Sequence, residues 1–264
     1  MMKKSPTKEG SRFKPFNRPI VLSVVMPVYN EASTVEQAIT AVLDFDLSPH
    51  RLELVIIESN STDRTREIVQ KFADDVRVKL ILQEEARGKG AAVREGFQQC
   101  TGDIILIQDG DLEYDVADYP KLLAPILSGE TAFVLGSRHE EGRPLRLMPD
   151  ARLISKIVNA GHHVFLMMFN ITYGTKLRDP FTMYKVFRRK CIENVEFVAN
   201  RFDFDFELVA KLMRLGYMPI EVPVYYSARS FAAGKKVRFF RDPLTWIVAC
   251  VRFRFSPLND NAHR

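Results

Sequence analysis

The chain has 264 residues, of which 46% are hydrophobic and 27% charged, and its formal net charge is +5. This composition excludes a disordered or collagen-like chain, and the charge is too small to indicate a nucleic-acid-binding protein. The length favours one compact α/β domain. The widely spaced cysteines predict free thiols, not a zinc site or disulfides; they are Cys100, Cys191 and Cys250.

Residues 1–19 carry six basic side chains and no apolar core, so they do not have the pattern of a secretory signal. We predict a solvated, disordered tail, and attraction to an anionic membrane surface is the alternative. No run of about 18 apolar residues occurs, which predicts that the chain has no transmembrane helix.

The N-terminal half alternates apolar runs with helical periodicity. Strands are expected over residues 20–26, 52–57, 76–82 and 104–107. Helices are expected after the first three strands, and Ser33 and Glu36 have capping-box spacing at the start of the first helix. This order predicts a parallel sheet with helices on both faces.

Polar clusters follow the expected strands at residues 29–31, 58–60, 87–90 and 109–111. In open parallel sheets, ligands bind beyond the carboxyl ends of the strands. We therefore expect these clusters to share one edge of the sheet and to form a site there.

The second half is less regular. Strands are expected at residues 132–135 and 219–226, helices at 152–169 and 205–215, and a charged loop at 139–150. Residues 229–254 hold seven Lys or Arg against one acid. We predict a domain over residues 20–228 and a basic C-terminal extension over 229–264. The extension either packs on the domain or lies on an anionic membrane, inserting Phe239, Phe240, Trp246 and Phe253.

Two short motifs carry the candidate chemistry. Asp109 and Asp111 directly follow a buried strand, and two carboxylates one residue apart suit Mg²⁺ or Mn²⁺; Glu113 is a third candidate ligand. Two solvated turn aspartates are the alternative. Lys89 lies between two glycines before a helix, which is typical of a phosphate-binding turn or of an ordinary strand-to-helix connection.

Five short strings occur in a fixed order along the chain. They are VVMPVYNE (24–31), ESNSTD (58–63), GKG (88–90), QDGD (108–111) and GSR (136–138). Together they resemble the family 2 glycosyltransferases, over about residues 20–255. The later strings DPFTMYK (179–185) and EVPVYY (221–226) resemble the polyprenyl-phosphate sugar transferase branch, similar to the dolichol-phosphate mannosyl- and glucosyltransferases.

The resemblance implies a GT-A fold, a Rossmann-like, mostly parallel sheet flanked by helices, and inverting hexose transfer from a UDP- or GDP-sugar. The favoured acceptor is a polyprenyl phosphate at the cytoplasmic face of a membrane, where the enzyme binds peripherally. The donor nucleotide would contact Pro27, Tyr29, Glu31, Glu58, Lys89, Asp109 and Gly110. The metal would lie on Asp109, Asp111 and Glu113. The acceptor phosphate would contact Arg138, Arg152 and Ser155, and the catalytic residues would be Asp111, Arg138 and Asp179.

Several interpretations stay open from the sequence alone. Arg229, Lys235 and Lys236 either close over the donor diphosphate or belong to a solvated basic segment. The alternative acceptor is a soluble molecule or a glycan with a reacting hydroxyl, for which Asp179 would be the general base; otherwise Asp179 is a helix cap or an ion-pair partner of an arginine. An inactive nucleotide-binding scaffold and a nucleotidyltransferase are the alternatives to a glycosyltransferase.

Overall fold

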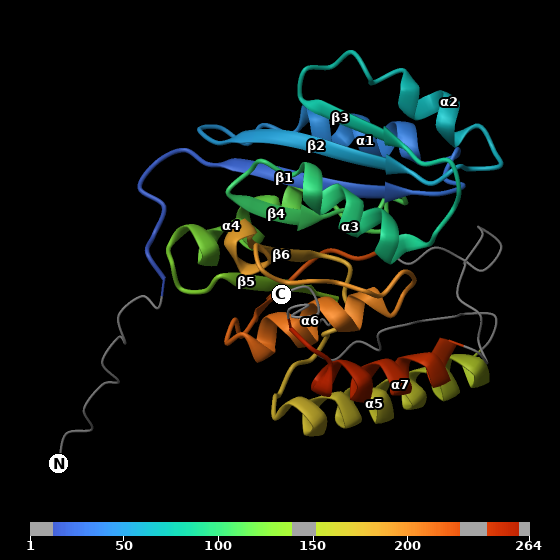
Figure 1. Cartoon of the computed structure of the whole chain (residues 1–264), viewed down its shortest axis with the longest axis vertical. Coiled ribbons are helices and arrows are strands. Elements are labelled where there is room, and N and C mark those ends of the chain that lie inside the picture. Colours follow the sequence, from blue (N-terminus) through green and yellow to red (C-terminus); the bar gives the residue numbers. More distant parts are fainter. Residues whose placement is uncertain (1–12, 139–151, 228–241, 259–264) are drawn as a thin grey trace, which may run out of the picture.

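The structure is a computed structural model that describes residues 13–138, 152–227 and 242–258. Seven strands form one sheet in the order β3-β2-β1-β4-β6-β5-β7 (Figure 1). The strands are β1 (Val21–Val28), β2 (Arg51–Glu58), β3 (Val78–Leu82), β4 (Ile104–Ile107), β5 (Phe133–Ser137), β6 (Lys185–Arg188) and β7 (Ile220–Pro223).

Helices cover both faces of the sheet. The helices are α1 (Val35–Asp44), α2 (Thr65–Gln70), α3 (Lys89–Gln99), α4 (Tyr119–Leu127), α5 (Arg152–Tyr173), α6 (Phe204–Arg214) and α7 (Asp242–Phe255). Side chains of α1, α2 and α4 share one buried cluster, and side chains of α3, α5, α6 and α7 share the other. Because neighbouring strand residues point to opposite faces, Leu54 joins the first cluster and Val55 the second. Burial on both faces explains the continuous apolar runs of the sequence.

The predicted parallel sheet is confirmed for the N-terminal half. β1 pairs in parallel with β2 and β4, and β2 pairs in parallel with β3. β6 was not predicted; it is antiparallel to both β4 and β5, and β5 is parallel to β7. β5 and β7 therefore run in the same direction as β4. The ends of all the strands except β6, and the start of β6, lie at one edge, which we call the carboxyl edge.

The folded domain extends further toward the N-terminus than the predicted boundary at residue 20. The backbone N–H of Phe13 donates to Gly129 O (3.1 Å), and that of Phe16 donates to Leu127 O (2.9 Å). The guanidinium of Arg188 lies over both phenylalanine rings. Residues 13–19 are therefore not a disordered tail, because their aromatic side chains pack on the sheet. The prediction for residues 1–12 lies outside the described residues.

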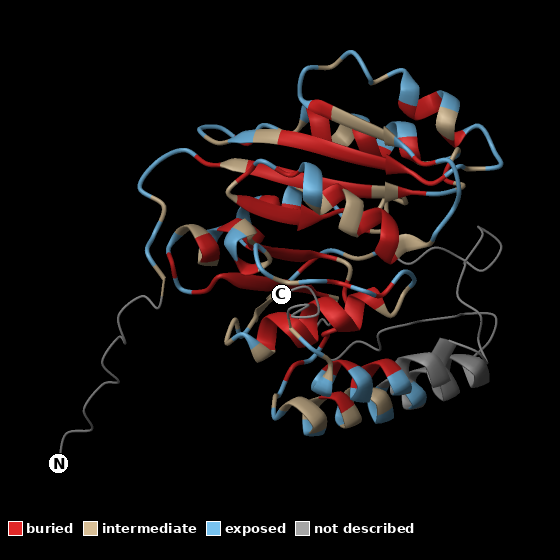
Figure 2. Ribbon diagram, in the orientation of Figure 1, coloured by how far each residue is buried: buried red, intermediate tan, exposed pale blue. Residues whose placement is uncertain are grey.

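The C-terminal helix α7 belongs to the core. Ala249, Cys250 and Phe253 are buried against α6 and α5 (Figure 2). The membrane alternative is therefore wrong for Phe253, because this ring faces inward. Phe239 and Phe240 lie outside the described residues, and the side chain of Trp246 is not described. None of the helices within the described ranges combines the length and apolarity that crossing a membrane requires.

Candidate active site

The ends of β1 and β2 are joined by hydrogen bonds at the carboxyl edge. The N–H of Asn30 donates to Ser61 Oγ (2.9 Å), and the N–H of Thr62 donates to Asn30 Oδ1 (2.8 Å). Asn30 and Asn60 both have a φ of 52°, a left-handed conformation that asparagine tolerates better than most residues. The two polar clusters thus form one connected wall, from which Tyr29 is 37% exposed.

The two acidic residues predicted to hold the nucleoside, Glu31 and Glu58, are buried. Glu58 is fully buried; its Oε1 accepts from Ser61 N–H (2.6 Å), and its Oε2 forms an ion pair with Arg66. Glu31 is also buried, and its backbone N–H donates to Thr65 Oγ1 (2.8 Å). The Glu58 carboxylate therefore anchors the turn after β2 in this structure, whereas Tyr29 and the partly exposed Pro27 present surface to a ligand.

The two motifs predicted to bind a diphosphate meet at the carboxyl edge. The Nζ of Lys89 lies 2.5 Å from Asp109 Oδ1. Burial opposes the charge on this lysine, but the carboxylates of Asp109 and Asp205 raise the pKa of Lys89 above its ordinary value. The start of α3 thus brings a permanent cation to the end of β4.

Two glycines make this approach possible. Gly88 has a φ of +102°, and a Cβ on Gly90 would lie 2.6 Å from both Ala199 O and Phe204 Cβ. The start of α3 is therefore packed directly against the loop before α6.

The loop after β4 is held by the residue before α1, because the Thr34 hydroxyl donates to the carbonyl of Gly110 (2.8 Å). The predicted capping box of Ser33 and Glu36 is wrong, because α1 begins at Val35 and its N-cap is therefore Thr34, which makes no side-chain capping bond.

The three carboxylates predicted to bind a metal do not converge. Among the described residues, no group of three His, Cys, Asp or Glu side chains could hold a metal ion. Lys89 pairs with Asp109, and the carboxylate of Glu113 accepts from the Tyr226 hydroxyl (2.9 Å). Mg²⁺ often uses only one or two protein carboxylates and takes its other ligands from water and substrate phosphates. Asp109 and Asp111 fit that mode, and Glu113 does not join them.

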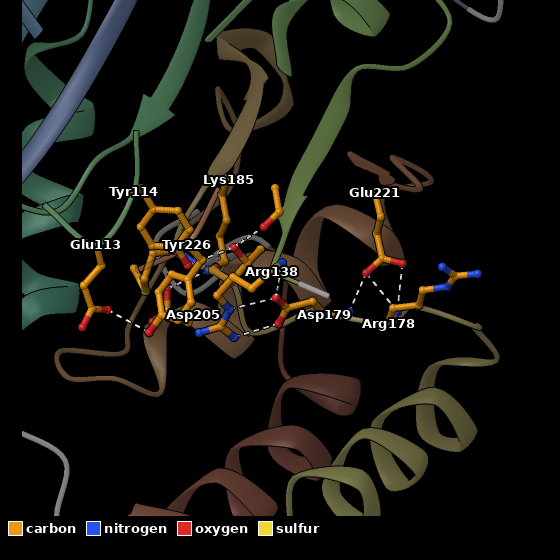
Figure 3. Close-up of polar contacts among 12 residues, drawn as sticks. Glu113, Tyr114, Arg138, Arg178, Asp179, Lys185, Asp205, Glu221 and Tyr226 are labelled. Carbon is orange, nitrogen blue, oxygen red and sulfur yellow. Dashed lines mark hydrogen bonds and ion pairs between the residues drawn. The ribbon is translucent and has the colours of Figure 1, made fainter. Parts of the chain in front are cut away.

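Arg138 and Asp179 form a buried pair at the end of β5 (Figure 3). The guanidinium donates from Nε to Oδ2 (2.8 Å) and from Nη2 to Oδ1 (2.7 Å), and the Arg138 N–H also donates to Oδ2 (2.9 Å). Burial opposes the charge on the arginine, but Asp179 raises the pKa of Arg138 well above its ordinary value. The guanidinium also lies 5.3 Å from the centre of the Tyr226 ring. Tyr226 therefore contacts both this pair and Glu113.

Sequence reasoning missed Glu221, which holds the pair from behind. Its Oε1 accepts from the N–H groups of Arg178 (2.9 Å) and Asp179 (2.5 Å), so the β7 strand fixes the loop that carries Asp179. Burial raises the pKa of Glu221. The string EVPVYY includes Glu221, but the sequence predicted no role for this residue; its signal there is an acid beside apolar residues.

A second buried pair, Lys185 with Asp205, lies beside these groups, with 2.9 Å between Nζ and Oδ1. Burial lowers the pKa of Lys185, and the charges of Lys89 and Arg138 lower it further. Three cations thus lie near one another, each paired with one aspartate. The fold therefore fixes three ion pairs here, in one of which the Lys185 side chain is fully buried.

Five further residues predicted for the site have side chains that the structure does not describe. Arg152 and Ser155 lie in the first turn of α5, at positions whose side chains are not described. Arg229, Lys235 and Lys236 lie outside the described residues.

Comparisons with known proteins agree with this arrangement. The family described as "Glycosyl transferase family 2" matches residues 23–195. The chain is 27% identical over 190 residues to a dolichol-phosphate mannosyltransferase of Pyrococcus furiosus; the match covers 72% of this chain and 52% of that protein. It is 30% identical over 211 residues to a dolichyl-phosphate hexose transferase of Haloferax volcanii, covering 79% of this chain and 84% of the relative.

Solved structures share the fold. A glucosyl-3-phosphoglycerate synthase of Mycobacterium tuberculosis in complex with UDP superposes with a TM-score of 0.66 at 20% identity, over 90% of this chain and 81% of that chain. This likeness confirms the predicted GT-A fold, and the sequence relatives confirm the resemblance to the polyprenyl-phosphate branch. On its motifs, its sheet and its relatives, the chain belongs to glycosyl transferase family 2.

Proposed function

We propose that this glycosyltransferase moves a hexose from a UDP- or GDP-sugar to a polyprenyl phosphate, with inversion at the anomeric carbon. It would act at the cytoplasmic face of a membrane and bind there peripherally. The observation that carries this proposal is the shared carboxyl edge. It holds Lys89 against Asp109 on the donor side and Arg138 against Asp179 on the acceptor side.

The named relatives support the acceptor class, since the two compared here are a dolichol-phosphate mannosyltransferase and a dolichyl-phosphate hexose transferase. The chain spans only about half of the first of these proteins. A structural neighbour crystallised with Mn²⁺ and UDP-glucose supports the donor class.

The geometry favours a phosphate acceptor over a hydroxyl acceptor. A general base must reach the proton that it removes. Asp179 is fully buried, and both of its oxygens accept hydrogen bonds from Arg138. A phosphate is already anionic and needs cations to position it rather than a base, and Arg138 can supply one. We therefore prefer the ion-pair role for Asp179.

In the proposed reaction, a phosphate oxygen of the acceptor attacks the anomeric carbon from the face opposite the nucleoside diphosphate. The bond between that carbon and the diphosphate oxygen breaks, and its electron pair leaves with the diphosphate. Lys89 faces this developing negative charge, and fixed cations are effective in such sites. Mg²⁺ or Mn²⁺ bound at Asp109 and Asp111 would neutralise further charge on the leaving group.

The direct test measures nucleoside diphosphate release with a panel of UDP- and GDP-hexoses. The acceptors are a short polyprenyl phosphate, the same alcohol without its phosphate, and 3-phosphoglycerate. We expect one donor class to react with the polyprenyl phosphate alone. Transfer to the alcohol at a comparable rate would restore Asp179 as a base. Reaction with 3-phosphoglycerate alone would replace the lipid with a soluble acceptor.

The metal assignment has its own test. Asp111→Asn should abolish the thermal stabilisation that a nucleotide-sugar gives with Mn²⁺, because it removes one of the two carboxylates while the shape is kept. Ligand binding to the folded state raises its stability by about 2.7 kcal/mol at one hundred times Kd, so the shift is measurable. Asp74→Asn, in an exposed turn, is the matched control. Retained, chelator-sensitive stabilisation in Asp111→Asn would remove this residue from the metal site.

A further inference from the structure

Two helices at one end of the molecule expose apolar rows. On α5, the side chains of Val164, Met167 and Ile171 are exposed, and Ile171 is 74% exposed. Their spacing of three and four residues puts them on one face of the helix. The opposite face is in the core, where Phe169 is buried.

The helix α7 repeats this pattern. Val248, Val251 and Phe255 are exposed at the same spacing, and Phe255 is 78% exposed. Phe253, on the opposite side, is fully buried. We call the six exposed residues of the two helices the apolar face. Large apolar residues exposed in such rows are unusual for a surface that only contacts water.

The two rows belong to one surface. The Tyr173 hydroxyl donates to Cys250 O (2.8 Å), and the Arg254 Nε–H donates to Thr172 O (3.2 Å), so the C-terminal ends of the helices are fastened together. Figures 1 and 2 show α5 and α7 side by side at the end of the long axis farthest from β3, with exposed positions along both helices. Their inner sides pack on α6 and the sheet.

The charges in the sequences of α5 and α7 are almost all positive. The sequence of α5 contains no acid, and that of α7 contains one, Asp242, at its first position. Arg252 and Arg254 on α7 are exposed. An apolar row flanked by arginines complements a bilayer surface, whose acyl region accepts the apolar side chains and whose anionic headgroups attract the cations.

The apolar face is also linked to the acceptor side of the active site. Asn170 of α5 accepts a hydrogen bond from Leu177 N–H (2.9 Å) and donates one to Leu177 O (2.8 Å). Leu177 lies two residues before Asp179, the partner of Arg138, and Figure 3 shows α5 and α7 beneath this loop. A lipid held in a membrane under α5 and α7 would present its phosphate near Arg138.

We propose that the apolar face of α5 and α7 docks on an anionic lipid bilayer and sets the orientation of the active site toward the membrane. This inference deepens the proposed function and rests on it for the identity of the acceptor. It names the docking residues, which differ from those predicted from the sequence: α7 offers Val248, Val251 and Phe255, and not Phe253.

The test is vesicle flotation of the full chain, with vesicles of phosphatidylcholine alone or with one third phosphatidylglycerol. We expect the wild type to float with the anionic vesicles, less so at high salt. The variant Ile171→Glu with Phe255→Glu should lose at least tenfold in the bound fraction. The matched control, Val76→Glu with Met218→Glu, adds the same charge at exposed apolar positions elsewhere and should float like the wild type.

Circular dichroism and thermal unfolding check that both double variants fold. A folded Ile171→Glu, Phe255→Glu variant that floats like the wild type would overturn the proposal. So would a wild-type dimer that this variant converts to a monomer, because the face would then bind a second copy.

Turnover separates this proposal from the proposed function. With a long-chain polyprenyl phosphate in vesicles, the variant should lose activity, and with a short, water-soluble prenyl phosphate it should match the wild type. Flotation of a wild type that transfers no sugar to either acceptor would support the docking face and contradict the function. Equal loss with both acceptors would overturn the docking role.

Discussion

The buried pair of Arg138 and Asp179 is the residue-scale feature on which the proposed acceptor site depends. Removing one member of such a pair leaves an unpaired buried charge, which typically costs about 3–5 kcal/mol. In an alanine variant, a loss of activity could therefore come from lost stability as well as from weaker acceptor binding. A lysine keeps the charge and loses the two-pronged geometry that only a guanidinium offers.

Arg138→Lys should raise the KM for the polyprenyl phosphate roughly tenfold, the effect of one lost charged hydrogen bond, and change the donor KM by less than about twofold. Steady-state kinetics with each substrate varied in turn gives both constants. Arg18→Lys is a suitable control, because Arg18 forms an exposed pair of the same two-bond geometry with Asp103, at the opposite edge of the sheet. Equal increases in both KM values would move Arg138 to the donor site.

The residues near the ends of strands could be predicted from the sequence. The long-range hydrogen bonds that hold or engage them could not. Asp109 and Arg138 come just after β4 and β5, and Lys89 begins the helix that follows β3, so the parallel pattern places them at one edge. Glu221 acts on a loop 42 residues earlier in the chain through backbone N–H groups, which have no sequence signature. The pairing of Glu113 with Tyr226 spans 113 residues, so the sequence did not reveal that Glu113 was already engaged.

At the scale of elements, the carboxylate of Glu53 links neighbouring strands at the edge of the sheet opposite the carboxyl edge. From β2 its carboxylate accepts hydrogen bonds from Ser23 of β1 (2.5 Å), Lys79 of β3 (2.8 Å) and Thr101, which precedes β4. Burial by itself would raise the pKa of Glu53, but these hydrogen bonds lower it to about 2. The ionised carboxylate therefore stabilises the folded sheet.

The sign of the pH dependence follows from the lowered pKa. The stabilisation is complete above the ordinary pKa of 4.5 and is lost as the pH falls toward about 2. It amounts to about 3 kcal/mol when complete. Urea unfolding of the wild type and Glu53→Gln should show a large difference at pH 7 that shrinks by pH 3. A difference that is the same at both pH values would mean that the charge of Glu53 contributes nothing.

The start of α3 gives a second prediction about elements. In Gly90→Ala, the new methyl group would lie 2.6 Å from Ala199 O and Phe204 Cβ. The start of α3 must therefore move away from α6 and from the loop before it. We expect a loss of about 1–3 kcal/mol in stability and weaker nucleotide-sugar binding, since Lys89 moves too. Thermal unfolding with and without the donor measures both effects. Gly161→Ala in α5, which would meet no atom within 4 Å, should not destabilise the protein. Similar behaviour of the two variants would refute the tight packing.

For the whole molecule, the parallel half was predictable and the second half was only partly so. Apolar β-branched runs reveal β1, β2 and β4, because each is buried on both faces. β6 has four residues, charged at both ends, and its Lys185 is fully buried beside Asp205. α4 contains two prolines, which disguise its periodicity. The aromatic rings of Phe13 and Phe16 pack against partners far along the chain, among them Arg188 and, for Phe13, the ring of Tyr217.

The place of β6 in the sheet has a consequence for the order of folding during synthesis. β5 leaves the ribosome before β6, yet it joins β4 only through β6, which must insert between them. Until then the edge of β4 is unpaired, and unpaired strand edges invite association with other chains. The strands β1 to β4 can assemble early, because they pair with one another. The proposed acceptor site around Arg138 and Asp179 is completed only once β6 has arrived. The start of α3, which carries Lys89, gains its packing partners only with the loop before α6, so neither half of the proposed site is complete until the second half of the chain has been made.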